Sequence, residues 1–185
     1  MGFAQPTYYD YTAEQYFEID GLEDQKFEYY LGDVYSMAGT TTTHNTIAIN
    51  IVLSLANQIT DKCRVYMSDV RLEVKKNAIY FYPDVVLTCE KADLNNTKGI
   101  AHPSLIVEVL SPSTETKDLN EKLDAYTQIP TVLYYMLVGQ TPFSVKLYER
   151  ANHFWAYTSY TKEDDEIHFA QLGLKMRVKE IYKNV

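Results

Sequence analysis

Two short apolar runs of this chain each contain one acidic residue, at positions that the core of a β-sheet normally leaves to apolar side chains. Asp84 lies in the run over residues 79–87, and Glu108 lies in the run over residues 105–110. An unpaired carboxylate buried in such a run either costs a large free energy or takes up a proton. A compensating partner is therefore expected, and a metal ion is the leading candidate.

The size and composition of the chain are those of one ordinary globular domain. It has 185 residues, of which 46% are hydrophobic and 23% are charged, so we expect residues 1–185 to form a single domain around one core. The net charge of −8 argues against a protein that coats nucleic acid by electrostatics alone. It does not exclude a nuclease, because an acidic metal site adds negative charge. The 17 tyrosines are predicted to fill the rim of the core and an oligomer interface.

The sequence predicts a cytoplasmic protein with no membrane partner. No apolar run approaches the ~20 residues of a membrane-spanning helix, and the first residues lack the basic start and apolar segment of a secretory signal. Cys63 and Cys89 have no neighbouring ligand pattern, so a zinc site is not expected. In a reducing compartment we expect these two residues to be free thiols and not a disulfide.

The spacing of apolar residues predicts a few helices among many short strands, which points to a mixed α/β or α+β domain. We expect a hairpin at residues 27–37, around Gly32 and Asp33, and a polar loop at residues 90–99. The predicted helices lie at residues 12–19, 44–58, 117–128 and 178–182. The predicted strands lie at residues 64–67, 70–74, 79–87, 105–110, 132–138, 144–150, 154–160 and 166–172.

If Asp84 and Glu108 lie on neighbouring strands, their oxygens can converge on one divalent cation. Mg²⁺ favours carboxylate and water ligands and commonly uses only one or two carboxylates. Such an ion can activate a water and stabilise the charge that develops on a phosphate. Lys122 borders the apolar stripe of the helix at residues 117–128, so its ammonium can assist if that helix packs over the Glu108 strand.

Three motifs give the chain a resemblance to a known family. They are Tyr-Pro-Asp-Val-Val at residues 82–86, Pro-Ser-Leu-Ile-Val-Glu-Val-Leu-Ser-Pro-Ser-Thr at residues 103–114, and Asp-Leu-Asn-Glu-Lys-Leu-Asp-Ala-Tyr at residues 118–126. With the segment at residues 27–33 and the Thr43-His44 helix start, they resemble the Uma-two family of restriction-endonuclease-like proteins, in the PD-(D/E)XK nuclease superfamily. The resemblance covers residues 12–182. It implies a restriction-endonuclease-like mixed β-sheet flanked by helices, with added β-hairpins.

The resemblance also implies a set of catalytic residues. Asp84 and Glu108 would bind Mg²⁺ or Mn²⁺, and Glu28 would be an additional acid of the same metal site. Leu110 stands where the superfamily signature has its lysine, two residues after Glu108. The resemblance implies that Lys122 supplies this ammonium from the following helix, but a leucine at this position could equally mark a site that has lost its activity.

Each of these residues also has a simpler structural interpretation. Glu108 could form a buried salt bridge with Arg71 or Lys122, and Asp84 could be an ordinary turn or bulge carboxylate. Glu28 could pair with Lys26 or with a neighbour across its strand. Lys122 taken alone is more typical of a solvated helix residue.

Three further residues are candidates for substrate binding. His44 lies at a helix start, where a histidine is also structurally ordinary. Ser111, with Ser113 and Thr114, could contact a phosphate at the start of the next helix, although helix capping is the more common role of such residues. Asp118 lies four residues before Lys122 on the same helix face and could orient it.

Taken together, the sequence favours a metal-dependent endonuclease that hydrolyses DNA phosphodiester bonds. The alternative is a catalytically inactive nuclease-fold domain that binds a nucleic acid or a protein. A hydrolase of a different phosphate ester is a third possibility. The expected partners are DNA, a divalent metal and a second copy of the chain in a two-fold homodimer.

Overall fold

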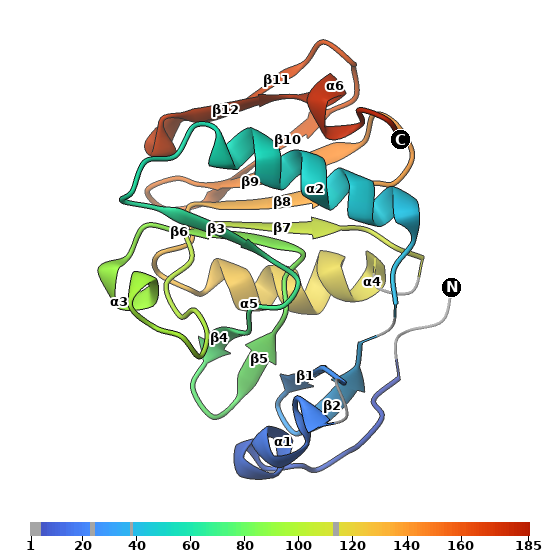
Figure 1. Ribbon diagram of the computed structural model, residues 1–185, viewed down its shortest axis with the longest axis vertical. Helices are drawn as coiled ribbons and strands as arrows, with labels where there is room; N and C mark the ends of the chain where they lie inside the picture. The colour runs from blue at the N-terminus through green and yellow to red at the C-terminus, as the bar shows by residue number, and fades with distance from the viewer. Residues whose placement is uncertain (1–4, 23–24, 38, 113–114) are drawn as a thin grey trace.

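The computed structural model describes residues 5–22, 25–37, 39–112 and 115–185, and its strands form three sheets (Figure 1). The six-stranded sheet has the order β10-β9-β8-β7-β6-β3, the four-stranded sheet has the order β2-β1-β5-β4, and β11 pairs with β12. The strands are β1 (Phe27–Tyr30), β2 (Asp33–Ser36), β3 (Arg64–Met67), β4 (Leu72–Lys75), β5 (Ile79–Phe81), β6 (Val85–Thr88), β7 (Leu105–Val109), β8 (Tyr134–Val138), β9 (Val145–Arg150), β10 (Trp155–Tyr160), β11 (Glu166–Phe169) and β12 (Leu174–Arg177).

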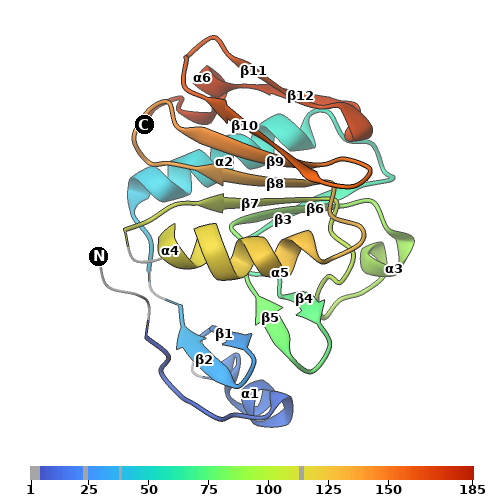
Figure 2. The same ribbon diagram turned by 180° about the vertical axis from the view of Figure 1, so that it is seen from behind.

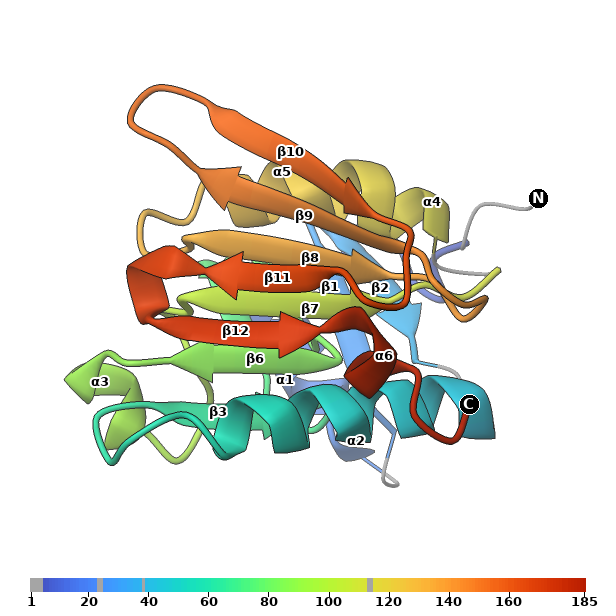
Figure 3. The same cartoon turned by 90° about the horizontal axis from the view of Figure 1, so that it is seen from above.

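Helices cover both faces of the six-stranded sheet. The helical segments are α1 (Ala13–Ile19), α2 (Thr42–Ala56), α3 (Lys91–Leu94), α4 (Glu115–Lys117), the π-helical turn η2 (Asp118–Lys122), α5 (Leu123–Thr127), the 3-10 turn η3 (Ala170–Leu172) and α6 (Val178–Ile181). α2 lies on one face, and the continuous segment α4–η2–α5 lies on the other (Figures 1 and 2). Seen from above, the β11–β12 hairpin lies over the middle strands of the sheet (Figure 3), where it joins the same core cluster as α2.

Alternation along β7 explains how the sheet serves two cores. Leu105, Val107 and Val109 pack in the cluster under α2, and Ile106 packs in the cluster under α5. Because successive side chains of a strand point to opposite faces, Glu108 points to the α5 side together with Ile106. β7 is parallel to β8 and antiparallel to β6, so the sheet is mixed as predicted.

Local signals account for the starts of two of the predicted helices. Thr12 caps α1 and Thr41 caps α2, since each threonine side chain accepts a hydrogen bond from a backbone N–H three residues later. Along α2, Ile47, Ile51 and Leu55 are fully buried against the sheet. The hairpin predicted at residues 27–37 is also confirmed, as β1 and β2.

One predicted strand is in fact two strands in different sheets. Residues 79–87 were expected to form a single strand, but β5 belongs to the four-stranded sheet and β6 to the six-stranded sheet. The break falls at Tyr82, Pro83 and Asp84, because proline has no N–H for a ladder and stops the first pairing. Asp84 therefore lies where the chain passes from one sheet to the other.

Smaller differences lie near the ends of predicted elements. The predicted loop at residues 90–99 contains the one-turn helix α3, and the strand predicted at residues 166–172 ends at Phe169 and continues as η3. β12 was not predicted. Its register with β11 buries Met176 beside Ile167, a contact that becomes visible only when the hairpin docks on the sheet.

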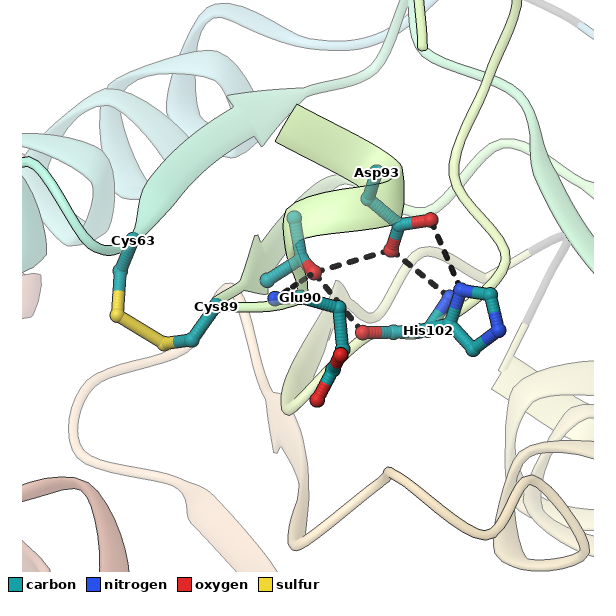
Figure 4. Close-up of a disulfide and its surroundings, with 6 residues drawn as sticks. Cys63, Cys89, Glu90, Asp93 and His102 are labelled. Atoms are coloured by element: carbon teal, nitrogen blue, oxygen red, sulfur yellow. Dashed lines mark hydrogen bonds and ion pairs between the residues drawn. A yellow bond between two sulfur atoms is a disulfide. The ribbon is translucent and has the colours of Figure 1, made fainter. Parts of the chain in front are cut away.

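The prediction of two free thiols is wrong, because Cys63 and Cys89 form a disulfide (Figure 4). Cys63 directly precedes β3 and Cys89 directly follows β6. In this antiparallel pair Arg64 lies opposite Thr88, so the next position brings the two cysteines together, with their Cα atoms 4.0 Å apart. Strand register, which the spacing of the cysteines does not reveal, decides this pairing.

None of the helices in the described ranges has the length and apolar content that crossing a bilayer requires.

Candidate active site

Asp84 and Glu108 meet at the start of β6, as predicted for acids on neighbouring strands. Val85 lies opposite Val107 in the β6–β7 register, so Asp84, one residue before, faces Glu108, one residue after. The Asp84 N–H donates to Glu108 Oε2 over 3.4 Å, and the Val109 N–H donates to Asp84 Oδ2 over 2.7 Å. These contacts fix both carboxylates to backbone at the same end of the sheet.

Lys122 reaches these acids from η2 and is buried, not solvated. Its Nζ lies 2.9 Å from Glu108 Oε1, 2.9 Å from Glu28 Oε1 and 3.4 Å from Asp118 Oδ1. The Tyr126 hydroxyl donates to Glu108 Oε1 over 2.9 Å. Of the two salt bridges considered for Glu108, the structure contains the one with Lys122. The ammonium of Lys122 is therefore shared among carboxylates from three elements.

Two other predicted pairings are replaced by different ones. Arg71 pairs with Asp20 over 2.9 Å, not with Glu108. Lys26 pairs with Asp69, not with Glu28. Leu110 is 9% exposed and packs in the core cluster under α5, so this position contributes to apolar packing.

Glu28 projects from β1 into the same centre, and a lysine that sequence analysis missed meets it there. Glu28 Oε1 faces Lys122, and Glu28 Oε2 lies 2.9 Å from Lys117 Nζ. The Tyr82 N–H also donates to Glu28 Oε1, over 3.4 Å. The only sequence signal for Lys117 was its place next to Asp118 in the third motif, because α-helical spacing puts residues 117 and 122 on different sides of a helix.

His44 is the third residue of α2, which covers the face of the six-stranded sheet opposite to the face that Lys122 covers (Figures 1 and 2). Its Nε2 lies 3.1 Å from Asp84 Oδ2, and its Nδ1 is buried and has no hydrogen-bond partner among the described residues. The Thr41 hydroxyl accepts a hydrogen bond from the His44 N–H and so caps α2. The same hydroxyl donates to Gln140 Oε1. This chain of contacts ties the start of α2 to the turn between β8 and β9, and so fixes His44 beside Asp84.

The remaining substrate-binding candidates differ in where the structure places them. Asp118 is buried and contacts Lys122 as its four-residue spacing predicted, and its backbone carbonyl accepts a hydrogen bond from the Tyr135 hydroxyl. Ser111 lies two residues after β7, at the same end of the sheet as Glu108. Ser113 and Thr114 lie outside the described residues.

Burial and neighbouring charges shift the pKa values of this centre in different directions. Burial raises the pKa of Glu108 well above its usual value, although Lys122 opposes the change. Burial alone would raise the pKa of Glu28, but Lys117 and Lys122 outweigh it and lower the pKa to about 2. Burial alone would lower the pKa of Lys122, but Glu108 and Glu28 raise it well above its usual value. Glu28 is thus an anion at neutral pH, between the ammonium groups of Lys117 and Lys122. At Glu108 the nearby positive charge does not fully offset the effect of burial on the pKa.

The donor set fits a hard divalent cation held by two carboxylates. Within the described ranges, no group of three or more His, Cys, Asp or Glu side chains is arranged to hold a metal ion. Mg²⁺ often takes only one or two carboxylates and keeps several waters. Asp84 Oδ1 has no hydrogen-bond donor among the described residues, and Glu108 Oε2 receives only the long bond from the Asp84 N–H. One oxygen of each acid therefore has lone pairs to offer.

Comparison with known proteins identifies the family of the chain. The family model Uma2, described as "Putative restriction endonuclease", matches residues 13–179. The chain belongs to the Uma2 family. Two uncharacterized proteins of Synechocystis sp. are similar to it. One is 30% identical over 176 residues, covering 94% of this chain and 92% of the relative. The other is 32% identical over 163 residues, covering 86% and 92%.

A solved structure shares the fold of this Uma2 chain. It is the crystal structure of a protein described as a putative nuclease from Anabaena variabilis, and it matches with a TM-score of 0.75, covering 93% of this chain and 97% of that one. At 15% sequence identity the likeness establishes the fold alone. The predicted mixed sheet flanked by helices is thereby confirmed.

Proposed function

We propose that this chain is a metal-dependent endonuclease that hydrolyses DNA phosphodiester bonds, with Asp84, Glu108 and Lys122 as its catalytic groups. The observation that supports it is the meeting of Asp84 and Glu108 at one end of the sheet, with Lys122 Nζ 2.9 Å from Glu108. A scaffold has no need of several buried carboxylates and two buried lysines at the contact of two sheets, because well-packed apolar residues of similar volume commonly stabilise a fold at least as well as a buried ion pair does.

Asp84 and Glu108 would hold Mg²⁺ or Mn²⁺. When bound, such an ion lowers the pKa of a coordinated water and neutralises charge on the phosphate. The chain's own contribution is to keep the two carboxylates in place before substrate arrives. Asp84 is held by the Val109 N–H and His44, and Glu108 is held by Tyr126 and Lys122.

Lys122 would stabilise the negative charge that develops on the phosphate and orient the attacking water. Its location on η2, and not two residues after Glu108, changes the direction from which the ammonium arrives. The role requires a charged ammonium, and the raised pKa of Lys122, which its carboxylate neighbours produce against the effect of burial, keeps the group protonated. The predicted homodimer and cytoplasmic location stay predictions.

Metal binding is the first experiment, because it does not depend on finding the right DNA. Mn²⁺ is titrated by calorimetry into the wild type, Asp84→Ala, Glu108→Ala and the exposed-acid control Asp61→Ala. We expect the first two variants to lose at least tenfold in affinity and the control to match the wild type. Equal binding by all four proteins would contradict the proposed metal site.

Plasmid nicking then separates an enzyme from a binding domain. With Mg²⁺ or Mn²⁺ the wild type and the exposed-lysine control Lys62→Ala should convert supercoiled plasmid to nicked or linear DNA, and Lys122→Ala should not. DNA binding by a wild type that binds metal but does not nick any DNA would instead favour the catalytically inactive domain.

A further inference from the structure

Lys117 is held from two sides by the β1–β2 hairpin. Its side chain is 7% exposed, its Nζ lies 2.9 Å from Glu28 Oε2, and the same atom lies 3.6 Å from the centre of the Tyr35 ring. A carboxylate and an aromatic face are the two kinds of surface that bind an ammonium most favourably in a protein. The ammonium of Lys117 thus lies within binding distance of both.

The hairpin presents these two groups together because of its register. Glu28 lies directly opposite Tyr35 in the β1–β2 pair, and residues that face each other across an antiparallel pair project to the same side. The carboxylate and the ring therefore form one binding surface for Lys117. This surface belongs to the four-stranded sheet, whereas Lys117 belongs to the helical segment that covers the six-stranded sheet.

The π-helical turn brings Lys117 and Lys122 to the same carboxylate. In an α-helix, residues five apart are separated by about 500° of rotation, which leaves them roughly 140° apart around the axis. A π turn is wider and joins residues five apart by its hydrogen bonds. η2 spans Asp118–Lys122, and Lys117, just before this turn, and Lys122, its last residue, take one oxygen each of Glu28.

This geometry links Lys117 to Lys122 through Glu28. Lys117 occupies Glu28 Oε2, which leaves Glu28 Oε1 directed at Lys122 Nζ, and Lys122 in turn contacts Glu108. We infer that Lys117, bound by Glu28 and Tyr35, is a positioning residue that holds Lys122 in contact with Glu108. Glu28 connects the two lysines, since each of its oxygens binds one of them. The inference rests on the proposed function, because the step that Lys122 assists is the cleavage proposed above.

A first experiment reads the position of Lys122 without any nuclease assay. The native protein is treated briefly with an amine-acetylating reagent, and modification of each lysine is followed by mass spectrometry. Lys122 should react slowly in the wild type, at least fivefold faster in Lys117→Met, and at the wild-type rate in Lys117→Arg, which keeps a cation that pairs with carboxylates and stacks on rings. Exposed Lys62 should react equally in all three proteins. An unchanged Lys122 rate in Lys117→Met overturns the inference.

A second pair of variants covers the case in which Lys117→Met does not fold. Tyr35→Phe keeps the ring and removes only the hydroxyl, whereas Tyr35→Leu removes the aromatic face. Lys122 should be acetylated faster in Tyr35→Leu and at the wild-type rate in Tyr35→Phe. Equal acetylation rates of Lys122 in these two variants contradict the inference that the Tyr35 ring helps to hold Lys117.

Kinetics then distinguish positioning from direct DNA contact. Lys117→Met should lower kcat for nicking by about 10- to 100-fold, as small displacements of catalytic groups do, with KM for DNA unchanged, and Lys117→Arg should restore it. The Kd for Mn²⁺ should stay within twofold of the wild type in Lys117→Met and in Glu28→Gln, because neither residue then binds the metal. A raised KM with unchanged kcat in Lys117→Met would mean that Lys117 contacts DNA. Tenfold weaker Mn²⁺ binding by Glu28→Gln would mean that Glu28 is a metal ligand. Either result overturns the inference.

The two proposals fail in different ways. A wild type that nicks no DNA contradicts the proposed nuclease, while the acetylation rates still decide whether Lys117 holds Lys122. A wild type that nicks DNA, together with unchanged acetylation and unchanged kcat in Lys117→Met, leaves the nuclease intact and removes the positioning role.

Discussion

A buried acid lies near each end of β6, and the two acids have different kinds of hydrogen-bond partners. Asp93 lies at the far end, next to Thr88, and Glu108 lies at the near end, next to Asp84. At the far end, Asp93 accepts hydrogen bonds from the Thr88 hydroxyl and from the backbone N–H of Ala101. It also accepts from the backbone N–H and the ring of His102 (Figure 4). All these donors lie within nine residues of Asp93. At the near end, Glu108 accepts hydrogen bonds from Lys122 and Tyr126, which lie on the helical segment η2–α5. Lys117, just before this segment, binds Glu28, which lies 89 residues away in the sequence.

This difference separates an acid that we expect to be structural from one that we propose to be functional. Asp93 is surrounded by donors from its own loop, as is usual for a buried polar group that stabilises a fold. Glu108 has a raised pKa because burial is not fully compensated, and strongly shifted pKa values are typical of catalytic sites. The comparison predicts that replacing Glu108 alters activity, whereas replacing Asp93 alters stability.

The largest expected effect is that of Glu108→Gln on nicking. The rate should fall by about 10²- to 10³-fold, the usual cost of removing one preorganised polar group from an active site. The free energy of unfolding should change far less than the rate, because the amide has the shape of the carboxylate and its Oε1 can still accept hydrogen bonds from Lys122 and Tyr126. Urea unfolding measures the second quantity. A strongly destabilised Glu108→Gln that still nicks DNA would reverse the comparison.

Removal of the disulfide tests the far end of β6. The bond closes a loop between cysteines 26 positions apart, for which loop-closure entropy gives a stabilisation of about 3 kcal/mol. The double variant Cys63→Ser, Cys89→Ser should lose this amount in urea unfolding and keep the nicking rate of the wild type. The wild type treated with a reductant is the matched control and should unfold at the same midpoint as the double variant.

Glu28→Gln gives a pH-dependent loss of stability. The pKa of Glu28 is lowered from 4.5 to about 2 in the folded protein, so its contribution is present above pH 4.5 and disappears as the pH falls towards 2. The shift corresponds to roughly 3 kcal/mol at pH 7. Urea unfolding of the wild type and Glu28→Gln should therefore differ by this amount at pH 7 and converge below pH 4.5. A difference that is constant from pH 7 to pH 3 would contradict the buried ion pairs.

The smallest expected effect is that of Asp93→Ala. Its loss leaves several donors without their acceptor, which costs about 2 kcal/mol, while specific activity at a temperature where the variant is folded should match the wild type. The exposed Asp61→Ala should change stability by less than about 0.5 kcal/mol. A loss of nicking by folded Asp93→Ala would show that the two ends of β6 are coupled.

The sequence was sufficient where a residue's environment follows from its own segment. Asp84 and Glu108 stand out because their neighbours are apolar, and the register of β6 with β7 then brings them together. Lys122 was identified through its motif, and its distance to Glu108 agrees with the expectation that the helix packs over that strand. The helix at residues 12–19 and the hairpin at residues 27–37 are equally local, and both were predicted.

The sequence was insufficient where two distant segments decide the outcome. The disulfide depends on the pairing of β3 with β6, and the division of residues 79–87 depends on which sheet each half joins. Lys117 was missed because the π turn departs from the regular α-helix that the pattern of apolar residues indicates. Leu110 has a physical explanation only in three dimensions, where it fills the core under α5 while the lysine comes from elsewhere.

The connection between Glu28 and Lys117 also bears on when the protein becomes competent. Ribosomes release a chain from its N-terminus, so the β1–β2 hairpin emerges 89 residues before Lys117. Contacts between segments so far apart in sequence are slow to form, and during that interval the Glu28 carboxylate is solvated. The charged centre is complete only after the α4–η2–α5 segment has docked on the sheet, so the proposed cleavage has to wait for that step of folding.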